Sequence, residues 1–165
     1  MASAAQATAS IRLAGPDDAA AILALIVELA EFEQLSALLV ATEDSLREAL
    51  ADEQPRVECL VAEHGGEVVA YAMYFHNFSS FLSRRGLYLE DLYVSPKARR
   101  LGIASALLRR LAAIAVERRC ARFEWTVLDW NQSAIEFYEK IGATVMPDWR
   151  VVRMTGDALI RLAQA

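Results

Sequence analysis

The segment LYLEDLYVSPKARRLGIAS, residues 87–105, combines a buried strand, a basic turn and the start of a helix. Leu87 to Val94 are mostly large apolar or aromatic residues, as in a strand covered on both faces, and Pro96 cannot continue a hydrogen-bond ladder. From Ile103 onward, apolar residues recur at helical spacing. The turn from Ser95 to Gly102 therefore delivers a helix N-terminus, whose free N–H groups and dipole favour an anion.

The residues before this segment predict two helices and three strands. Gly15-Pro16-Asp17-Asp18 begins a helix that ends near Phe32-Glu33, and Thr42-Glu43-Asp44-Ser45 begins another that runs to about Ala51. The predicted strands are Ile11–Leu13, at a sheet edge, and Val57–Glu63 and Glu67–Phe75, which form a hairpin about His64–Gly66. Asn77 to Gly86 is predicted to be a loop, in which Phe78 and Phe81 either line a pocket or pack on the sheet.

The residues after the central segment predict a second alternation of strand and helix. Arg122–Leu128 is expected to be a strand, followed by a helix that Asn131 caps and Gly142 terminates. Trp149–Met154 is a further strand candidate, and Gly156–Gln164 closes the chain as a helix. Strands that both alternate with helices and form hairpins indicate a mixed α/β sheet with helices on both faces.

Length and composition limit the class of protein. The 165 residues suit a single domain, expected over residues 11–165 after a mobile tail of small residues at 1–10. A net charge of −5 argues against a nucleic-acid surface and favours cationic partners. Neither a signal peptide nor a membrane span is recognisable, so a cytoplasmic protein is expected. Cys59 and Cys120 fit apolar residues of a reducing compartment, and the two histidines lack metal-ligand spacing, so no metal is expected.

Glu90 and Asp91 are two adjacent carboxylates inside an otherwise apolar strand. Their burial without partners would cost several kcal/mol. Neighbours on a regular strand point to opposite faces, so both reach one pocket only if a bulge or a splay intervenes. The alternative is that one of them pairs with Arg84 or Arg85.

Several motifs together resemble one family. Arg99-x-x-Gly102-x-Ala104 between a strand and a helix resembles the acetyl-CoA pyrophosphate loop of the GNAT superfamily of N-acetyltransferases. Tyr88–Asp91, the run from Trp130 to Ala143, and Glu28–Glu33 are similar to the spermidine/spermine (diamine) acetyltransferase branch. The resemblance covers roughly residues 11–162.

The resemblance implies the GNAT fold and an acetyl-CoA site. In that fold, a mostly antiparallel mixed sheet has a splayed central strand pair, here Leu87–Val94 and Arg122–Leu128, and acetyl-CoA enters the cleft. The implied cofactor contacts are Leu92, Tyr93, Val94, Arg99, Arg100, Leu101, Gly102, Ile103, Ala104, Ser105, Asn131, Ser133, Ala134 and Tyr138. The alternatives are that Arg99 and Arg100 are ordinary surface charges and that Asn131 is only a helix cap.

The resemblance also implies catalytic and substrate-binding roles. Glu90 acts as general base through water, and Tyr138 as the general acid that protonates the departing CoA thiolate, unless Tyr138 is simply a core tyrosine. The implied substrate contacts are Phe32, Glu33, Glu90, Asp91, Glu124, Trp125, Thr126 and Asp148. Phe32 replaces the tyrosine of the family, which weakens the case for spermidine itself.

The leading prediction is direct acetyl transfer to the primary amine of a small cation in a ternary complex. That cation is a polyamine, a diamine or a thialysine-like amino acid. The alternatives are a protein or peptide N-acetyltransferase and a non-catalytic acyl-CoA-binding module. By resemblance, the protein is expected to be a homodimer.

Overall fold

The computed structural model describes residues 9–165, which divide into two compact units, one ending at Thr126 and the other spanning Val127–Ala165. Residues 1–8 of the expected mobile tail lie outside the described part. Ser10, which the sequence places in that tail, begins the first strand. The single domain expected over residues 11–165 stays a prediction.

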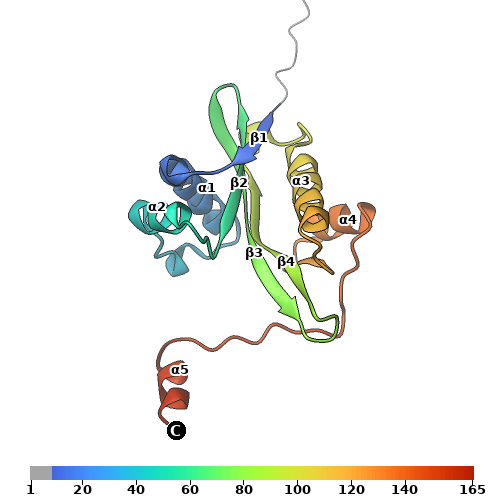
Figure 1. Cartoon of the computed structure of the whole chain (residues 1–165). Helices are drawn as coiled ribbons and strands as arrows, with labels where there is room; N and C mark the ends of the chain where they lie inside the picture. Colours follow the sequence, from blue (N-terminus) through green and yellow to red (C-terminus); the bar gives the residue numbers. More distant parts are fainter. Residues whose placement is uncertain (1–8) are drawn as a thin grey trace, which may run out of the picture. The chain divides into compact units, whose positions relative to one another are not determined.

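A five-stranded sheet in the order β1-β2-β3-β4-β5 forms the centre of the first unit (Figure 1). Strands β1 to β4 are antiparallel neighbours, and β5 pairs with β4 in parallel. This arrangement confirms the mixed sheet, the edge strand and the hairpin about His64–Gly66. The strands are β1 (Ser10–Leu13), β2 (Glu58–His64), β3 (Glu67–Ser79), β4 (Arg84–Val94) and β5 (Phe123–Trp125).

Helices cover both faces of this sheet. Helices α1 (Ala19–Phe32) and α2 (Glu43–Ala51) lie against one face, and α3 (Ile103–Glu117) lies against the other (Figure 1). The α1 face forms a core from Ala19, Ile22, Leu25, Leu46, Cys59, Val61, Tyr71 and Tyr93. On the opposite face, α3 buries its apolar stripe, which includes Leu107, Leu111 and Ile114. Much of β4 therefore lies between two apolar layers.

The predicted helix starts are confirmed by their local bonds. Pro16 opens a 3₁₀ turn, Pro16–Asp18, which leads directly into α1. Thr42 Oγ1 accepts a hydrogen bond from the Ser45 N–H at 3.2 Å and so caps α2. The Thr42 side chain thereby satisfies a backbone donor that α2 cannot satisfy itself.

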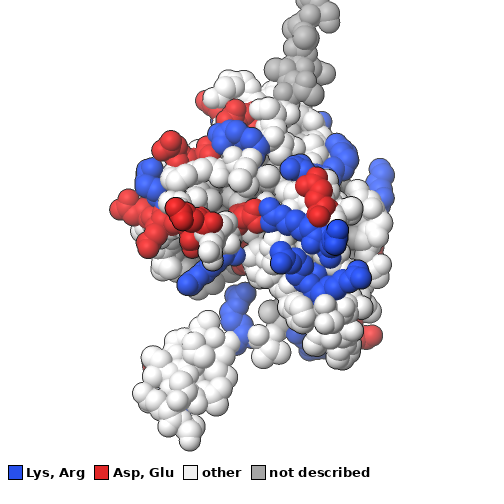
Figure 2. All heavy atoms as spheres, viewed as in Figure 1, with Lys and Arg blue, Asp and Glu red and all other residues white. Residues whose placement is uncertain are grey.

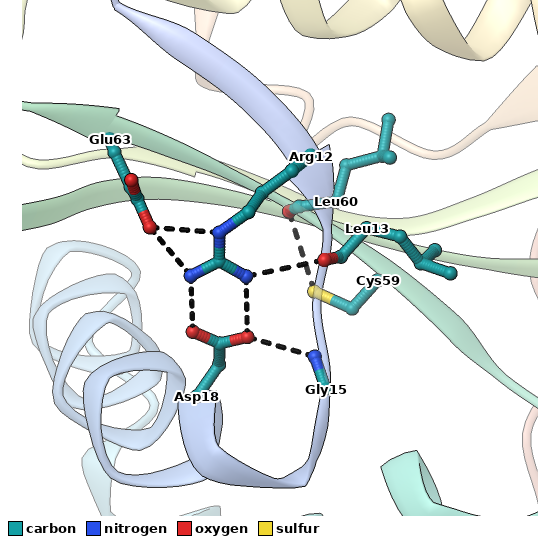
Figure 3. Close-up of polar contacts among 7 residues, drawn as sticks. All are labelled: Arg12, Leu13, Gly15, Asp18, Cys59, Leu60 and Glu63. Atoms are coloured by element: carbon teal, nitrogen blue, oxygen red, sulfur yellow. Dashed lines mark hydrogen bonds and ion pairs between the residues drawn. The ribbon is translucent and has the colours of Figure 1, made fainter.

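An arginine clamp fixes the start of α1 to the sheet (Figure 3). Arg12 on β1 donates to both Asp18 carboxylate oxygens at 2.7 Å and to Glu63 Oε1 on β2 at 2.6 and 2.8 Å. Asp18 Oδ2 also accepts from the Gly15 N–H at 2.8 Å. The Arg12 guanidinium holds the pKa of Asp18 below its usual range. These carboxylates are therefore compensated by a cation, which ties three chain segments together.

The expected loop Asn77–Gly86 is wrong, because the β3–β4 ladder continues through most of it. Asn77 pairs with Gly86, Phe78 with Arg85, and Ser79 with Arg84. The backbone groups of these residues are therefore satisfied by strand pairing. Phe78 and Phe81 are exposed, with 64% and 99% of their surface accessible.

The last strand of the sheet is shorter than the predicted Arg122–Leu128. It pairs with β4 only from Leu87 opposite Phe123 to Leu89 opposite Trp125. Beyond Leu89, β4 continues to Val94 without a ladder to β5 among the described residues. The ladder between the two strands therefore ends where β5 ends, and the expected splay stays a prediction.

The second unit contains α4 (Gln132–Lys140) and α5 (Gly156–Ala163). The Asn131 side chain caps α4, as predicted. The Ala143 N–H bonds to the Tyr138 carbonyl and the Gly142 N–H to the Glu139 carbonyl, with Gly142 at φ +96°. This is the left-handed helix end that glycine favours.

The strand expected at Trp149–Met154 is wrong. Those residues have no regular structure and no ladder partner among the described residues. Their β-forming side chains favour an extended backbone, but a strand forms only where a second strand pairs with it. No helix in the described part of the chain is long and apolar enough to cross a membrane.

Candidate active site

A β-bulge sits where the two strand carboxylates lie. Asp91 is opposite Met73 and Leu89 is opposite Tyr74, so Glu90 is the extra residue of β4. The extra residue breaks the alternation of faces. Glu90 is exposed and Asp91 is half-buried. The structure therefore contains the bulge that was expected if both carboxylates were to reach one pocket.

Asp91 lies in an acidic environment without a cation. Burial, followed by the carboxylates of Glu90 and Glu33, raises the pKa of Asp91 to about 6. The Tyr71 hydroxyl acts in the opposite direction and donates to Asp91 Oδ2 at 3.4 Å. The ion pairs of the described residues include neither Glu90 nor Asp91. The alternative pairing with Arg84 or Arg85 is therefore not realised.

The end of α1 brings a third carboxylate and an aromatic ring to this region. Glu33 follows α1 and is half-buried, and this burial raises its pKa. The adjacent Phe32 has 42% of its surface exposed. The Arg99 guanidinium lies 5.7 Å from the centre of the Phe32 ring. Of the predicted substrate contacts, the structure thus brings Glu33, Glu90 and Asp91 together. Phe32 precedes Glu33 in the sequence.

An open groove of about 510 Å³ runs between α1 and the end of β4. Its lining includes Glu28, Phe32, Tyr93, Ser95, Lys97 and Arg99. Glu28 Oε2 is buried there without a hydrogen-bond partner among the described residues. Sequence reasoning did not single out Glu28 for the site, although the first carboxylate after the apolar run of α1 was the available signal.

The turn after β4 has the geometry of an anion loop. Arg100 and Gly102 take the left-handed conformation, at φ +65° and +75°. The first helical bond of α3 joins the Ala106 N–H to the Gly102 carbonyl, so the N–H groups of residues 103–105 precede it. A side chain at Gly102 would meet nothing within 4 Å. This open, donor-rich helix start fits a diphosphate group.

The two arginines of the turn differ in their surroundings. Arg99 Nε donates to the Val94 carbonyl at 3.2 Å, and its guanidinium lies 5.8 Å from the Tyr93 ring centre. Arg99 therefore holds the turn against the end of β4. Arg100 is exposed beside the left-handed backbone. The predicted cofactor residues Leu92, Tyr93 and Val94 lie just before this turn, on the part of β4 that has no β5 partner.

The predicted substrate contacts on and after β5 differ from the acidic cluster, because the carboxylate among them has a cationic partner. Glu124 Oε2 accepts from Asn77 Nδ2 at 3.1 Å and pairs with Arg122 Nε at 2.7 Å. Its charge is therefore compensated within the protein. Trp125 packs near Phe123, with ring centres 4.8 Å apart, and Thr126 is exposed. Sequence reasoning did not single out Arg122, which lies just before β5. The available signal was the pair of opposite charges two positions apart, because side chains at that spacing share a face of an extended segment.

The second unit holds the remaining predicted site residues. Asn131 Oδ1 accepts a bond from the Ala134 N–H at 3.3 Å, which confirms its capping role. Tyr138 is half-buried, and burial raises its pKa. Its ring centre lies 5.5 Å from that of Phe137. Ser133 and Asp148 are exposed.

Charges are divided along the sequence of the first unit. Residues 17–53, which include α1 and α2, contain ten acidic residues and one arginine. Residues 84–122, which include β4 and α3, contain ten basic and three acidic residues. Figure 2 shows acidic side chains gathered over α1 and α2 and basic side chains gathered towards α3. Such a division suits a reaction between an anion and a cation.

The short parallel β4–β5 pair and the glycine-capped turn before α3 are features expected of an acetyl-CoA-dependent N-acetyltransferase. The chain belongs to the acetyltransferase (GNAT) family, whose sequence profile matches residues 23–143. This match crosses the boundary between the two structural units. The protein is therefore an N-acetyltransferase, and enzymes of this family use acetyl-CoA as cosubstrate.

The relatives and solved structures agree with this family. Thialysine N-epsilon-acetyltransferase of Sus scrofa is 37% identical and covers 95% of this chain and 98% of its own. L-ornithine N5-acetyltransferase of Arabidopsis thaliana is 33% identical and covers 90% of this chain and 85% of its own. An integron cassette protein from V. cholerae superimposes with a TM-score of 0.80 at 27% identity, covering 96% of this chain and 99% of its own.

Proposed function

We propose that this protein transfers the acetyl group of acetyl-CoA directly to a primary amine of a small cationic substrate. The substrate is a polyamine, a diamine or a basic amino acid of the thialysine or ornithine type. Relatives named for thialysine and ornithine acetylation support this substrate class. The observation that carries the proposal is the cluster of Glu33, Glu90 and Asp91, which no cation of the described residues neutralises.

A cation completes this acidic cluster. Three nearby carboxylates raise one another's free energy when they are ionised, and a bound ammonium group removes that cost. We assign Asp91 and Glu33 to the ammonium group that does not react. The exposed Glu90 takes the role of general base through a water molecule, because a protonated amine must lose a proton before it attacks the thioester.

The anion loop is assigned to the diphosphate of acetyl-CoA. The N–H groups at the start of α3 and the charge of Arg100 would hold the diphosphate. The part of β4 that pairs with β3 but has no β5 partner, from Leu92 to Val94, would bond to the amide groups of the pantetheine chain. Asn131, Ser133 and Ala134 at the start of α4 are assigned to the same chain.

Tyr138 is assigned as the general acid. The tetrahedral intermediate collapses when its carbon–sulfur bond breaks, and the departing thiolate takes up a proton. A phenol whose pKa is raised by burial stays protonated at neutral pH and is able to donate that proton. The amine attacks the thioester itself, so no acetylated side chain is formed.

The proposed function is tested by release of CoA thiol from acetyl-CoA with polyamines, diamines, basic amino acids and peptides. We expect release with one class of small cationic amine and a loss of roughly 100-fold in Tyr138→Phe. Tyr74→Phe is the matched control, because it removes a buried hydroxyl outside the site. Binding of acetyl-CoA without release by any small amine would overturn the proposal.

We also propose a homodimer in a reducing, cytoplasmic compartment. Within the second unit, the residues joining α4 to α5 expose several large apolar side chains, namely Val145, Met146, Trp149, Val151, Val152 and Met154. A second copy is suited to cover such a segment. Both cysteines are free, which fits reducing conditions. Light scattering that shows only an 18.2 kDa species would contradict the dimer.

A further inference from the structure

The hydroxyl of Tyr71 is a buried polar group to which the proposed reaction gives no role. The Tyr71 side chain is fully buried in the core beneath α1. Its ring fills space that a phenylalanine ring would fill equally well. The hydroxyl alone costs free energy to bury, and its hydrogen-bond partner is Asp91 Oδ2 at 3.4 Å.

Four elements place titratable groups around Asp91. Glu90 belongs to β4, Glu33 follows α1, Cys59 lies on β2 and Tyr71 lies on β3. Burial raises the pKa of the Cys59 thiol to about 12 and the pKa of Tyr71 far above its usual value, so both groups remain neutral at physiological pH. The two glutamates oppose the ionisation of Asp91, and Tyr71 donates a hydrogen bond that favours it.

We propose that Tyr71 is a positioning residue, which holds the Asp91 carboxylate in the orientation and charge state that bind the second ammonium group of the substrate. Tyr71 does not touch the substrate. The proposal rests on the proposed amine acetyltransferase function and deepens it. The hydrogen bond from Tyr71 explains how a carboxylate beside two others is ionised in most molecules at neutral pH and so is able to bind a cation.

Tyr71→Phe tests this role because it removes only the hydroxyl. We expect the acid limb of the pH profile of kcat/KM for the amine to move upward by roughly half a pH unit. At pH 6, KM for the amine should rise about twofold, because a half-unit shift of a pKa of about 6 halves the ionised fraction of Asp91 at that pH. The values of kcat and of KM for acetyl-CoA should stay unchanged. Tyr74→Phe, on the same strand but bonded to Glu58, should leave the profile in place.

A measurement without turnover separates this inference from the function itself. In protein with ¹³C-labelled aspartate, the Asp91 carboxyl should titrate at higher pH in Tyr71→Phe than in wild type. Incorporation of 3-fluorotyrosine, a stronger hydrogen-bond donor, should move the Asp91 titration to lower pH and needs no substitution that risks unfolding. Unchanged Asp91 titration in both proteins would overturn the role of Tyr71. A wild type that acetylates no amine would instead overturn the proposed function.

Discussion

Two buried tyrosines on β3 each donate to a carboxylate, and the two carboxylates are in opposite electrostatic states. On the α3 face, Tyr74 donates to Glu58 Oε2 at 3.2 Å, and Arg118 bonds to both oxygens of that carboxylate. Arg118 lowers the pKa of Glu58. On the α1 face, Tyr71 donates to Asp91, whose pKa burial and Glu90 raise to about 6.

The difference between the two faces is the presence of a cation. The Glu58 carboxylate has a cationic partner and a hydroxyl donor within the folded chain, so its charge contributes to stability. Among the described residues, the carboxylates of Glu33 and Glu90 act on Asp91 without a cation to balance them, so its charge costs stability until a ligand supplies the cation. A carboxylate that folding leaves uncompensated marks a place where binding completes the electrostatics.

The largest effect is expected on the α1 face when the proposed base is removed. Glu90→Gln keeps the shape of the bulge but cannot accept the proton of the amine. We expect kcat to fall by roughly 10²- to 10³-fold with little change in the affinity for acetyl-CoA. Steady-state kinetics and a direct binding titration measure the two quantities. A variant that retains most of its kcat would remove Glu90 from the mechanism.

The next largest effect is expected on the α3 face, and it concerns stability. Glu58→Gln leaves Arg118 without its charge partner, and the free energy of unfolding should fall by roughly 2 kcal/mol at pH 7. Because the pKa of Glu58 is lowered by folding, its contribution is present above the unfolded pKa and is lost as pH falls through the folded pKa. Urea unfolding at pH 7 and pH 3 checks this, and kcat per folded molecule should be unchanged.

Asp91→Asn should change stability in the opposite direction. The folded pKa of about 6 lies above the ordinary value of 3.8 for an aspartate, so the free energy of unfolding falls as pH rises from about 3.8 to about 6, and the full penalty is present above pH 6. Because the neutral amide of the asparagine cannot ionise, Asp91→Asn should raise the free energy of unfolding by roughly 1 to 2 kcal/mol at pH 7, with no gain near pH 3. The same urea experiments measure it. Loss of stability at pH 7 would mean that Asp91 is compensated after all.

The smallest effect is expected at the arginine clamp of Figure 3. Arg12→Gln leaves Asp18 and Glu63 without their cation, and the free energy of unfolding should fall by about 1 kcal/mol, because the arginine is partly exposed. Activity per folded molecule should be unchanged. This variant tests whether a carboxylate is structural because it has a cationic partner in the folded chain, and not because of the face of the sheet on which it lies. Loss of activity without loss of stability would contradict that distinction.

The sequence predicted those features that local chemistry determines. Pro16, Thr42 and Gly142 each mark a helix end through their own backbone or side-chain bonds. The bulge at Glu90 was predictable because a regular strand could not keep two adjacent carboxylates on one side. In these cases, residues close in sequence carry the whole physical argument.

Features that depend on distant pairing were not predictable. Ladder partners decided that residues 77–79 and 84–86 are strands and that Trp149–Met154 is not. The bond between Tyr71 and Asp91 joins residues 20 positions apart, and it depends on the register of β3 against β4. Neither the register of two strands nor the charge partner of a carboxylate can be predicted from a single segment of sequence, because both depend on distant residues.

The central claim is that the uncompensated carboxylates bind the second cation of the substrate. Acetylation of 1,5-diaminopentane and of 1-aminopentane by wild type and by Asp91→Asn tests it most directly, since the two amines differ only in that cation. We predict that wild type prefers the diamine by at least about tenfold in kcat/KM and that Asp91→Asn loses most of this preference. An equal preference in both proteins would show that Asp91 does not bind the second cation and would contradict the account.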